Sequence, residues 1–149
     1  MSTTSAIDAQ LTAIQEGLSS RSGLTGVKVF SATVGIEEAG LECIALGFAT
    51  LQEIAFAMGG DREETWTITG SEIRVVSATW QGDTEATIQA ARSRAVALLA
   101  DIEEYLAETY TGDFPDVELT GAELSQNFTA DGRECRITFE LTLTGIKNP

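Results

Sequence analysis

Apolar and polar residues alternate most clearly near the end of the chain. Cys135, Ile137, Phe139, Leu141 and Leu143 share one parity, and the other parity holds Glu134, Arg136, Thr138, Glu140 and Thr142. Because successive side chains of a strand point to opposite faces, this period of two predicts a strand with one buried face. A similar period covers residues 65–69, where Trp66 and Ile68 alternate with threonines. We expect a strand there too.

Glycines shift the phase of this alternation in two places. Beyond Gly70 the apolar residues Ile73 and Val75 occupy the opposite parity, which predicts a β-bulge inside one long strand that ends near residues 80–82. A hairpin with residues 70–71 as its two-residue turn is the competing interpretation. Gly121 breaks the phase of a strand that begins at residue 117, and residues 131–132 predict a turn before the last strand.

The first third of the chain gives weaker signals. Residues 41–48 are apolar apart from Glu42 and Gly47, which is typical of a central strand covered on both faces. Residues 52–58 form a second candidate strand, although a helical turn would explain them equally well. Residues 27–30 are expected to form a short strand.

Two segments show helical spacing instead. The clearer one is capped by Asp83 or Thr84, closes at Gly112 and Pro115, and spans roughly 40 Å at 1.5 Å per residue. Its apolar stripe is broad enough to cover a sheet and comprises Ile88, Ala91, Ala95, Leu98, Leu99, Ile102, Tyr105 and Leu106. A shorter N-terminal helix is expected to end near Ser20. The sum is an α+β fold, a twisted antiparallel sheet with one long helix packed across a face and a short N-terminal helix, in a single domain over residues 1–149.

Charge and composition narrow the functional classes. The 149 residues include 9 Lys plus Arg against 23 Asp plus Glu, for a formal charge of −14, and no histidine. This balance argues against binding nucleic acid by neutralising phosphates. A Ser-His or Cys-His nucleophile is impossible, and no phosphate-binding loop is present in the sequence. The acidic pairs at 37–38, 63–64 and 103–104 fit solvated faces better than a metal or acid–base site. We therefore expect a protein without enzymatic activity and without catalytic, cofactor-binding or metal-binding residues.

Cysteine usage and hydropathy bear on where the chain is made. Cys43 and Cys135 lie in strand-like apolar patterns without CxxC spacing, so we expect buried free thiols. No apolar run approaches the roughly 20 residues that a membrane helix needs. We expect synthesis in the cytosol.

Several weak motifs follow one another in a recognisable order. They are residues 62–68 (Arg-Glu-Glu-Thr-Trp-Thr-Ile), Gly70 with a valine-rich strand, the helix core at 90–99 with residues 102–103, and Asp131-Gly132-Arg133 before the last alternating strand. In type and order this series resembles the tail terminator proteins of long, flexible-tailed (siphovirus-type) bacteriophages. The resemblance covers about residues 40–146. Residues 48–58 are more apolar than that family's pattern.

The resemblance implies a structural virion protein at the head-proximal end of the tail, made in the bacterial host cytoplasm. It would form a homo-oligomeric ring, expected to be a hexamer, that caps the tail tube, ends its polymerisation and forms the head–tail joining surface. Its partners would be the major tail tube protein and the head–tail connector or stopper protein. Genomic DNA would pass through an acidic lumen without specific binding, and no membrane or cofactor is implied.

The surfaces expected to meet a neighbour or partner are the Thr-rich strand 62–69, as a usable sheet edge, and the hairpin 121–133. The interface residues expected within or beside them are Arg62, Glu64, Trp66, Arg133 and Arg136, with the arginines pairing with a neighbour's acids. Alternative interpretations are another neck or tail-completion protein, such as a head–tail stopper or minor tail protein, and, more distantly, a small-molecule binding domain.

Overall fold

The computed structural model describes residues 3–32, 41–56, 62–77, 84–109, 116–129 and 132–147. Within these ranges six strands form one sheet in the order β1-β2-β4-β6-β5, and β3 pairs with β4 outside this path. The strands are β1 (Lys28–Phe30), β2 (Glu42–Ala45), β3 (Phe48–Phe56), β4 (Arg62–Ser77), β5 (Asp116–Thr129) and β6 (Gly132–Lys147).

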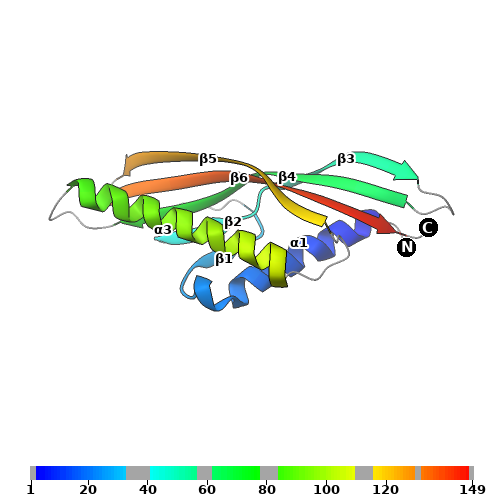
Figure 1. Cartoon of the computed structure of the whole chain (residues 1–149), viewed down its shortest axis with the longest axis horizontal. Helices are drawn as coiled ribbons and strands as arrows, with labels where there is room; N and C mark the ends of the chain where they lie inside the picture. Colours follow the sequence, from blue (N-terminus) through cyan, green and yellow to red (C-terminus); the bar gives the residue numbers. More distant parts are fainter. Residues whose placement is uncertain are drawn as a thin grey trace.

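Figure 1 shows the sheet drawn out along the long axis of the molecule, with the helix α3 (Thr84–Glu104) lying along one face and α1 (Thr3–Ser20) beside it. The predicted α+β fold with a long helix on a sheet is therefore confirmed. The sheet is mixed rather than wholly antiparallel, because β1 pairs parallel with β2. Periodicity in so short a strand carries no information about its direction, so the sequence could not indicate this pairing.

Gly70 marks a β-bulge, as its phase shift predicts. β4 is one continuous strand whose pairing with β6 passes from Ile68 opposite Leu141 to Ser71 opposite Phe139. Gly70 has a φ of +77°, a conformation that side chains other than glycine rarely adopt. The competing hairpin is thus wrong. The expected end of this strand at residues 80–82 lies outside the described residues.

β2 and β3 follow one another along the same edge of β4. Ala45 pairs with Glu72 and Phe48 pairs with Thr69, so the interruption between the two strands faces the bulge of β4. Residues 41–48 therefore do not form the single strand that their apolar run predicts. The alternative of a helical turn after residue 52 is also wrong, because β3 continues to Phe56.

The interruption depends on a close approach of two backbones at Gly47. A Cβ atom added there would lie 1.8 Å from the carbonyl oxygen of Thr69, so no larger residue fits without displacing the backbone of β4. The Gly47 amide donates a 2.8 Å hydrogen bond to the hydroxyl of Ser71, which is fully buried. This bond replaces a ladder bond lost at the bulge.

β5 and β6 form a long hairpin with a second bulge. Its pairing passes from Leu119 opposite Leu141 to Gly121 opposite Glu140, which confirms the phase break predicted at Gly121. The predicted turn falls partly on Asp131, outside the described residues, and β6 begins at Gly132.

The core lies between the sheet and the two helices. The alternating residues of β6 are buried as predicted, and α3 contributes Ala91, Ala95, Leu98 and Ile102 while α1 contributes Ile7, Ile14 and Leu18. α3 continues into a π-helical turn, η3 (Tyr105–Thr109). The expected closure at residues 112–115 lies outside the described residues. Among the residues the structure describes, no helix is long and apolar enough to span a membrane.

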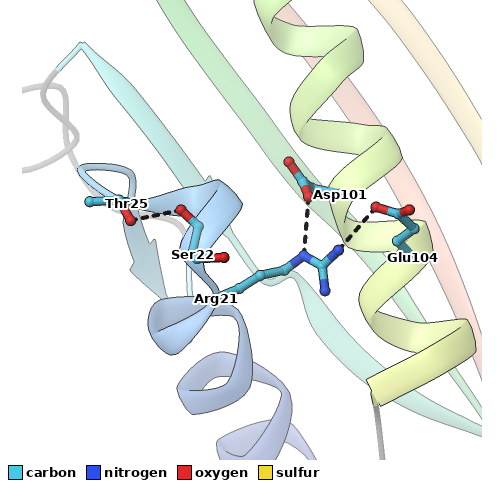
Figure 2. A network of polar contacts seen from close by, with 5 residues as sticks. All are labelled: Arg21, Ser22, Thr25, Asp101 and Glu104. Atoms are coloured by element: carbon cyan, nitrogen blue, oxygen red, sulfur yellow. Dashed lines mark hydrogen bonds and ion pairs between the residues drawn. The ribbon is translucent and has the colours of Figure 1, made fainter.

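An arginine after α1 ties the N-terminal segment to α3. The Nε of Arg21 lies 3.1 Å from Asp101 and its Nη2 lies 3.0 Å from Glu104, as Figure 2 shows. The short 3-10 helix that follows, η1 (Ser22–Leu24), is closed by a 2.7 Å hydrogen bond from Thr25 to the carbonyl of Ser22. Two acids of α3 thus fix the position of the turn between α1 and β1.

Candidate interaction surfaces

The sheet face away from α3 is rich in threonine and acid. Register places the polar positions of β6 there, together with Thr65, Thr67 and Thr69 of β4. Thr120 of the neighbouring β5 hydrogen-bonds to Thr142 at 3.1 Å and to Glu140 at 3.2 Å. The expected grouping of threonines on one face is confirmed, and we call it the open face.

One end of the open face holds a cluster of opposite charges. Nε of Arg74 lies 2.7 Å from Oε2 of Glu134, and both side chains are at least 95% buried. Arg136 lies 3.3 Å from Glu134 and 3.8 Å from Glu72. The alternation of β6 predicts one buried face and places Glu134 on the other face. Its burial is therefore a correction, and ion pairs with Arg74 and Arg136 neutralise its charge. Arg136, expected to pair with a neighbour's acids, is already engaged by two acids of its own chain.

Glu64 and Trp66 lie together on the helix-facing side of β4. The indole Nε1 of Trp66 donates a 3.0 Å hydrogen bond to Oε1 of Glu64. Glu64 is fully buried and Trp66 is half-buried against the core. Within the subunit the pair therefore joins the start of β4 to the core. Trp80 lies outside the described residues.

Arg62 and Arg133 occupy opposite ends of the sheet. Arg62 is the first residue of β4 and pairs through its backbone with Phe56 and Lys147. Arg133 is paired with Phe128 across the β5–β6 hairpin, and its guanidinium carbon lies 4.8 Å from the centroid of the Phe128 ring. The structure thus does not bring the five expected interface residues into one site.

The Thr-rich strand is not an edge of the sheet. Residues 62–69 pair with β3 on one side and with β6 on the other, so their backbone groups are already used. The sequence interpretation was wrong on this point, because alternation reveals the faces of a strand and not its neighbours. Any contact through this strand must use its open face.

The hairpin expected as a contact surface does contain an edge strand. β5 ends the sheet path and is exposed along residues 120–128, including Leu124 at 42% and Phe128 at 63% exposure. β3 also exposes large apolar side chains, at Phe48 and Ile54. Exposed apolar residues on edge strands are typical of protein contacts. The sequence signal for them was weak, because single apolar residues in a polar strand do not change its period.

Two open grooves lie at the two ends of β5. The larger, about 310 Å³, runs between η3 and the start of β5 and is lined by Glu103, Leu106, Ala107, Val117, Glu118 and Leu119. The smaller, about 130 Å³, lies at the hairpin end and is lined by Ile88, Gln126, Asn127, Phe128, Arg133 and Glu134. Gln126 fixes this end to α3 by a 3.1 Å hydrogen bond to the carbonyl of Ile88.

The cysteines are buried free thiols, as expected. Burial raises the pKa of both Cys43 and Cys135, and the Glu72 carboxylate raises that of Cys43 further. A raised pKa keeps a thiol protonated, so neither residue has the character of a nucleophile. Within the described ranges, no group of three or more Cys, Asp and Glu residues is placed to hold a metal ion.

The fold can be compared with known proteins. No family model matches the chain, and no curated protein matches it. A chain of the solved structure described as "Virion of native gene transfer agent (GTA) particle" superposes with a TM-score of 0.51 at 15% sequence identity. The match covers 94% of this chain and 98% of that one. The two chains share a fold. Their likeness extends over nearly the full length of both.

Proposed function

We propose that this protein is a structural component of a phage-like virion that caps the tail tube as a ring, ends tube polymerisation and forms the head–tail joining surface. The observation that carries the proposal is the full-length likeness to a chain of a gene transfer agent particle. It agrees with the resemblance to tail terminators that the order of sequence motifs indicates.

The surfaces of the subunit support an assembling role. β5 is a long exposed edge strand, and both β3 and β5 carry exposed large apolar residues. Monomeric proteins usually protect such edges, so their presence favours contacts with other chains. The open face, with its threonines and acids, suits a wall past which DNA moves without sticking, because like charges repel.

A second candidate is another neck or tail-completion protein, such as a head–tail stopper or a minor tail protein. The description of the similar structure names the whole particle and no component of it, so this observation favours both candidates equally. The order of sequence motifs favours the terminator. A small-molecule binding domain has less support, since the two grooves beside β5 are open to solvent, whereas small-molecule sites enclose most of their ligand.

Co-assembly with partners of the same virion tests the proposal. The purified protein is mixed with polymerising tail tube protein, and tube length and end structure are measured by negative-stain electron microscopy. Shortened tubes with a ring at one end are the expected result. Binding to the portal–adaptor complex with no effect on tubes would favour a stopper. Tubes of unchanged length and no binding to either partner would refute a role at this joint.

A further inference from the structure

The two ends of β5 carry surfaces of opposite character. We call the groove formed by Glu103, Leu106, Ala107, Val117, Glu118 and Leu119 the acidic groove, and the exposed end formed by Gln126, Asn127, Phe128 and Arg133 the hairpin patch. We infer that the hairpin patch of one copy docks into the acidic groove of the next copy. This inference names the contact between subunits of the proposed ring. It rests on the proposed function in one respect, namely that successive contacts close into a ring.

The hairpin patch presents a large apolar group beside a cation. Phe128 is 63% exposed, and the Arg133 guanidinium lies over its ring at 4.8 Å. Glu134 lines the same end, but ion pairs with Arg74 and Arg136 neutralise its charge. Arg92, exposed one turn after Ile88 on α3, adds a further positive charge. Aromatic residues and arginines are the side chains most enriched at the centres of protein interfaces.

The acidic groove has the complementary chemistry. Its floor is apolar, with Leu106 buried and Val117 and Leu119 half-buried, and its volume of about 310 Å³ exceeds that of a phenylalanine side chain. Glu103 is exposed on its rim, whereas Glu118 is opposite Thr142 and its side chain faces the open face. An aromatic ring would cover the apolar floor while an arginine beside it would meet the carboxylate of Glu103.

The two surfaces cannot meet within one copy. Nine residue steps of continuous strand lead from Leu119 to Phe128, which corresponds to roughly 30 Å at 3.3 Å per residue. Contact must therefore join different copies. Because the surfaces differ, the contact is heterologous, and repeated addition generates a closed ring or an open filament.

Charge reversal with mixing tests this geometry. Arg133→Glu places an acid against an acidic rim, and Glu103→Arg places two arginines together, so each variant alone should self-associate at least about tenfold more weakly than wild type. An equimolar mixture should recover assembly, because the intact patch of one variant meets the intact groove of the other, and the two reversed surfaces again have opposite charges. Light scattering over a concentration series measures both effects. Glu123→Arg, the same change at an exposed position of β5 outside both surfaces, is the matched control and should assemble like wild type.

Cysteine cross-linking gives a second measurement. The chain carrying both Gln126→Cys and Ala107→Cys should form a ladder of disulfide-linked oligomers on mild oxidation, whereas either change alone should give dimers at most. The native thiols are buried and are replaced by alanine in these variants, so they do not compete. The inference would be overturned, and the proposed function left standing, by any one of three results. These are an Arg133→Glu variant that assembles like wild type, a mixture that does not recover assembly, and the absence of the disulfide ladder. A wild-type chain that stays monomeric with and without tube protein would overturn the proposed ring as well.

Discussion

Arg74 and Glu134 form an ion pair of 2.7 Å between neighbouring strands, at the open face of the sheet, with 4% and 5% of their side chains exposed. A charge so deeply buried is tolerated because its partner is present. We expect Glu134→Gln and Arg74→Met each to lower the free energy of unfolding by about 3 kcal/mol, as for other broken buried pairs. Urea denaturation of each variant and of wild type measures this loss in the free energy of unfolding.

The double variant Arg74→Met with Glu134→Leu separates pairing from packing. It should cost less than the sum of the single changes, because no unpaired charge of this pair remains buried. Glu123→Gln, exposed on the same face, is the control and should change the free energy of unfolding by less than about 0.5 kcal/mol. Additive effects in the double variant would contradict the interpretation.

Gly47 and Gly121 should respond differently to the same substitution. Gly47→Ala would bring Cβ to 1.8 Å from a backbone oxygen of β4, and we expect a loss of more than about 2 kcal/mol. At Gly121 nothing lies within 4 Å of the added atom, so Gly121→Ala should be neutral or stabilise by up to about 1 kcal/mol. Thermal and urea unfolding of the two variants, measured in parallel, make the comparison. Equal effects would show that the backbones of β2–β3 and β4 do not approach closely at this point.

Arg21 provides a test of how the N-terminal segment is held. Asp101 is 23% exposed and Glu104 is 60% exposed, so the first ion pair is less screened by water. Arg21→Met should cost about 1 kcal/mol of stability. Asp101→Asn should cost more than Glu104→Gln, and the difference should shrink in high salt. The reverse order would indicate that the contact to Glu104 dominates.

Buried thiols make stability depend on alkaline pH. Burial raises the pKa of Cys43 above its ordinary value of 9.0. The folded state therefore holds the thiol proton more tightly, and this contribution is complete below the ordinary pKa and is lost as pH rises through the raised one. We expect the free energy of unfolding to fall as the pH rises above the ordinary thiol pKa, with a smaller fall in Cys43→Ala. Cys135 and Tyr105, whose pKa values are also raised by burial, act in the same direction. An identical pH profile in Cys43→Ala would contradict the assignment to this thiol.

Some of the fold could be predicted from the sequence because side-chain parity is a local property. In the last strand the apolar residues keep one parity throughout, which indicates its buried face. The bulges at Gly70 and Gly121 each shift that parity, and the shift is visible in the sequence. The apolar run at 41–48 gave no such sign. Its break at Gly47 is set by the approach of a distant strand, and both sides of the break are apolar.

The candidate surfaces were only partly predictable, for a related reason. The hairpin expected as a contact region does expose an edge strand, but the Thr-rich strand has a neighbour on each side. Strand order depends on contacts far apart in the sequence. Arg74 lies opposite Arg136, and Glu134 lies two residues before Arg136 on β6. This arrangement likewise depends on the register between β4 and β6, which no local pattern specifies.

β4 and β6 each run for 16 residues, or roughly 50 Å, and they pair along nearly this whole length. β2 and β3 pair with different parts of β4, so the two ends of the sheet are joined through the long β4–β6 pair. A pull along the long axis loads the ladder between these strands in shear, so that many hydrogen bonds share the force instead of opening one after another. The long β4–β6 pair therefore resists extension along its axis, and a displacement at one end of the sheet is transmitted to the other end.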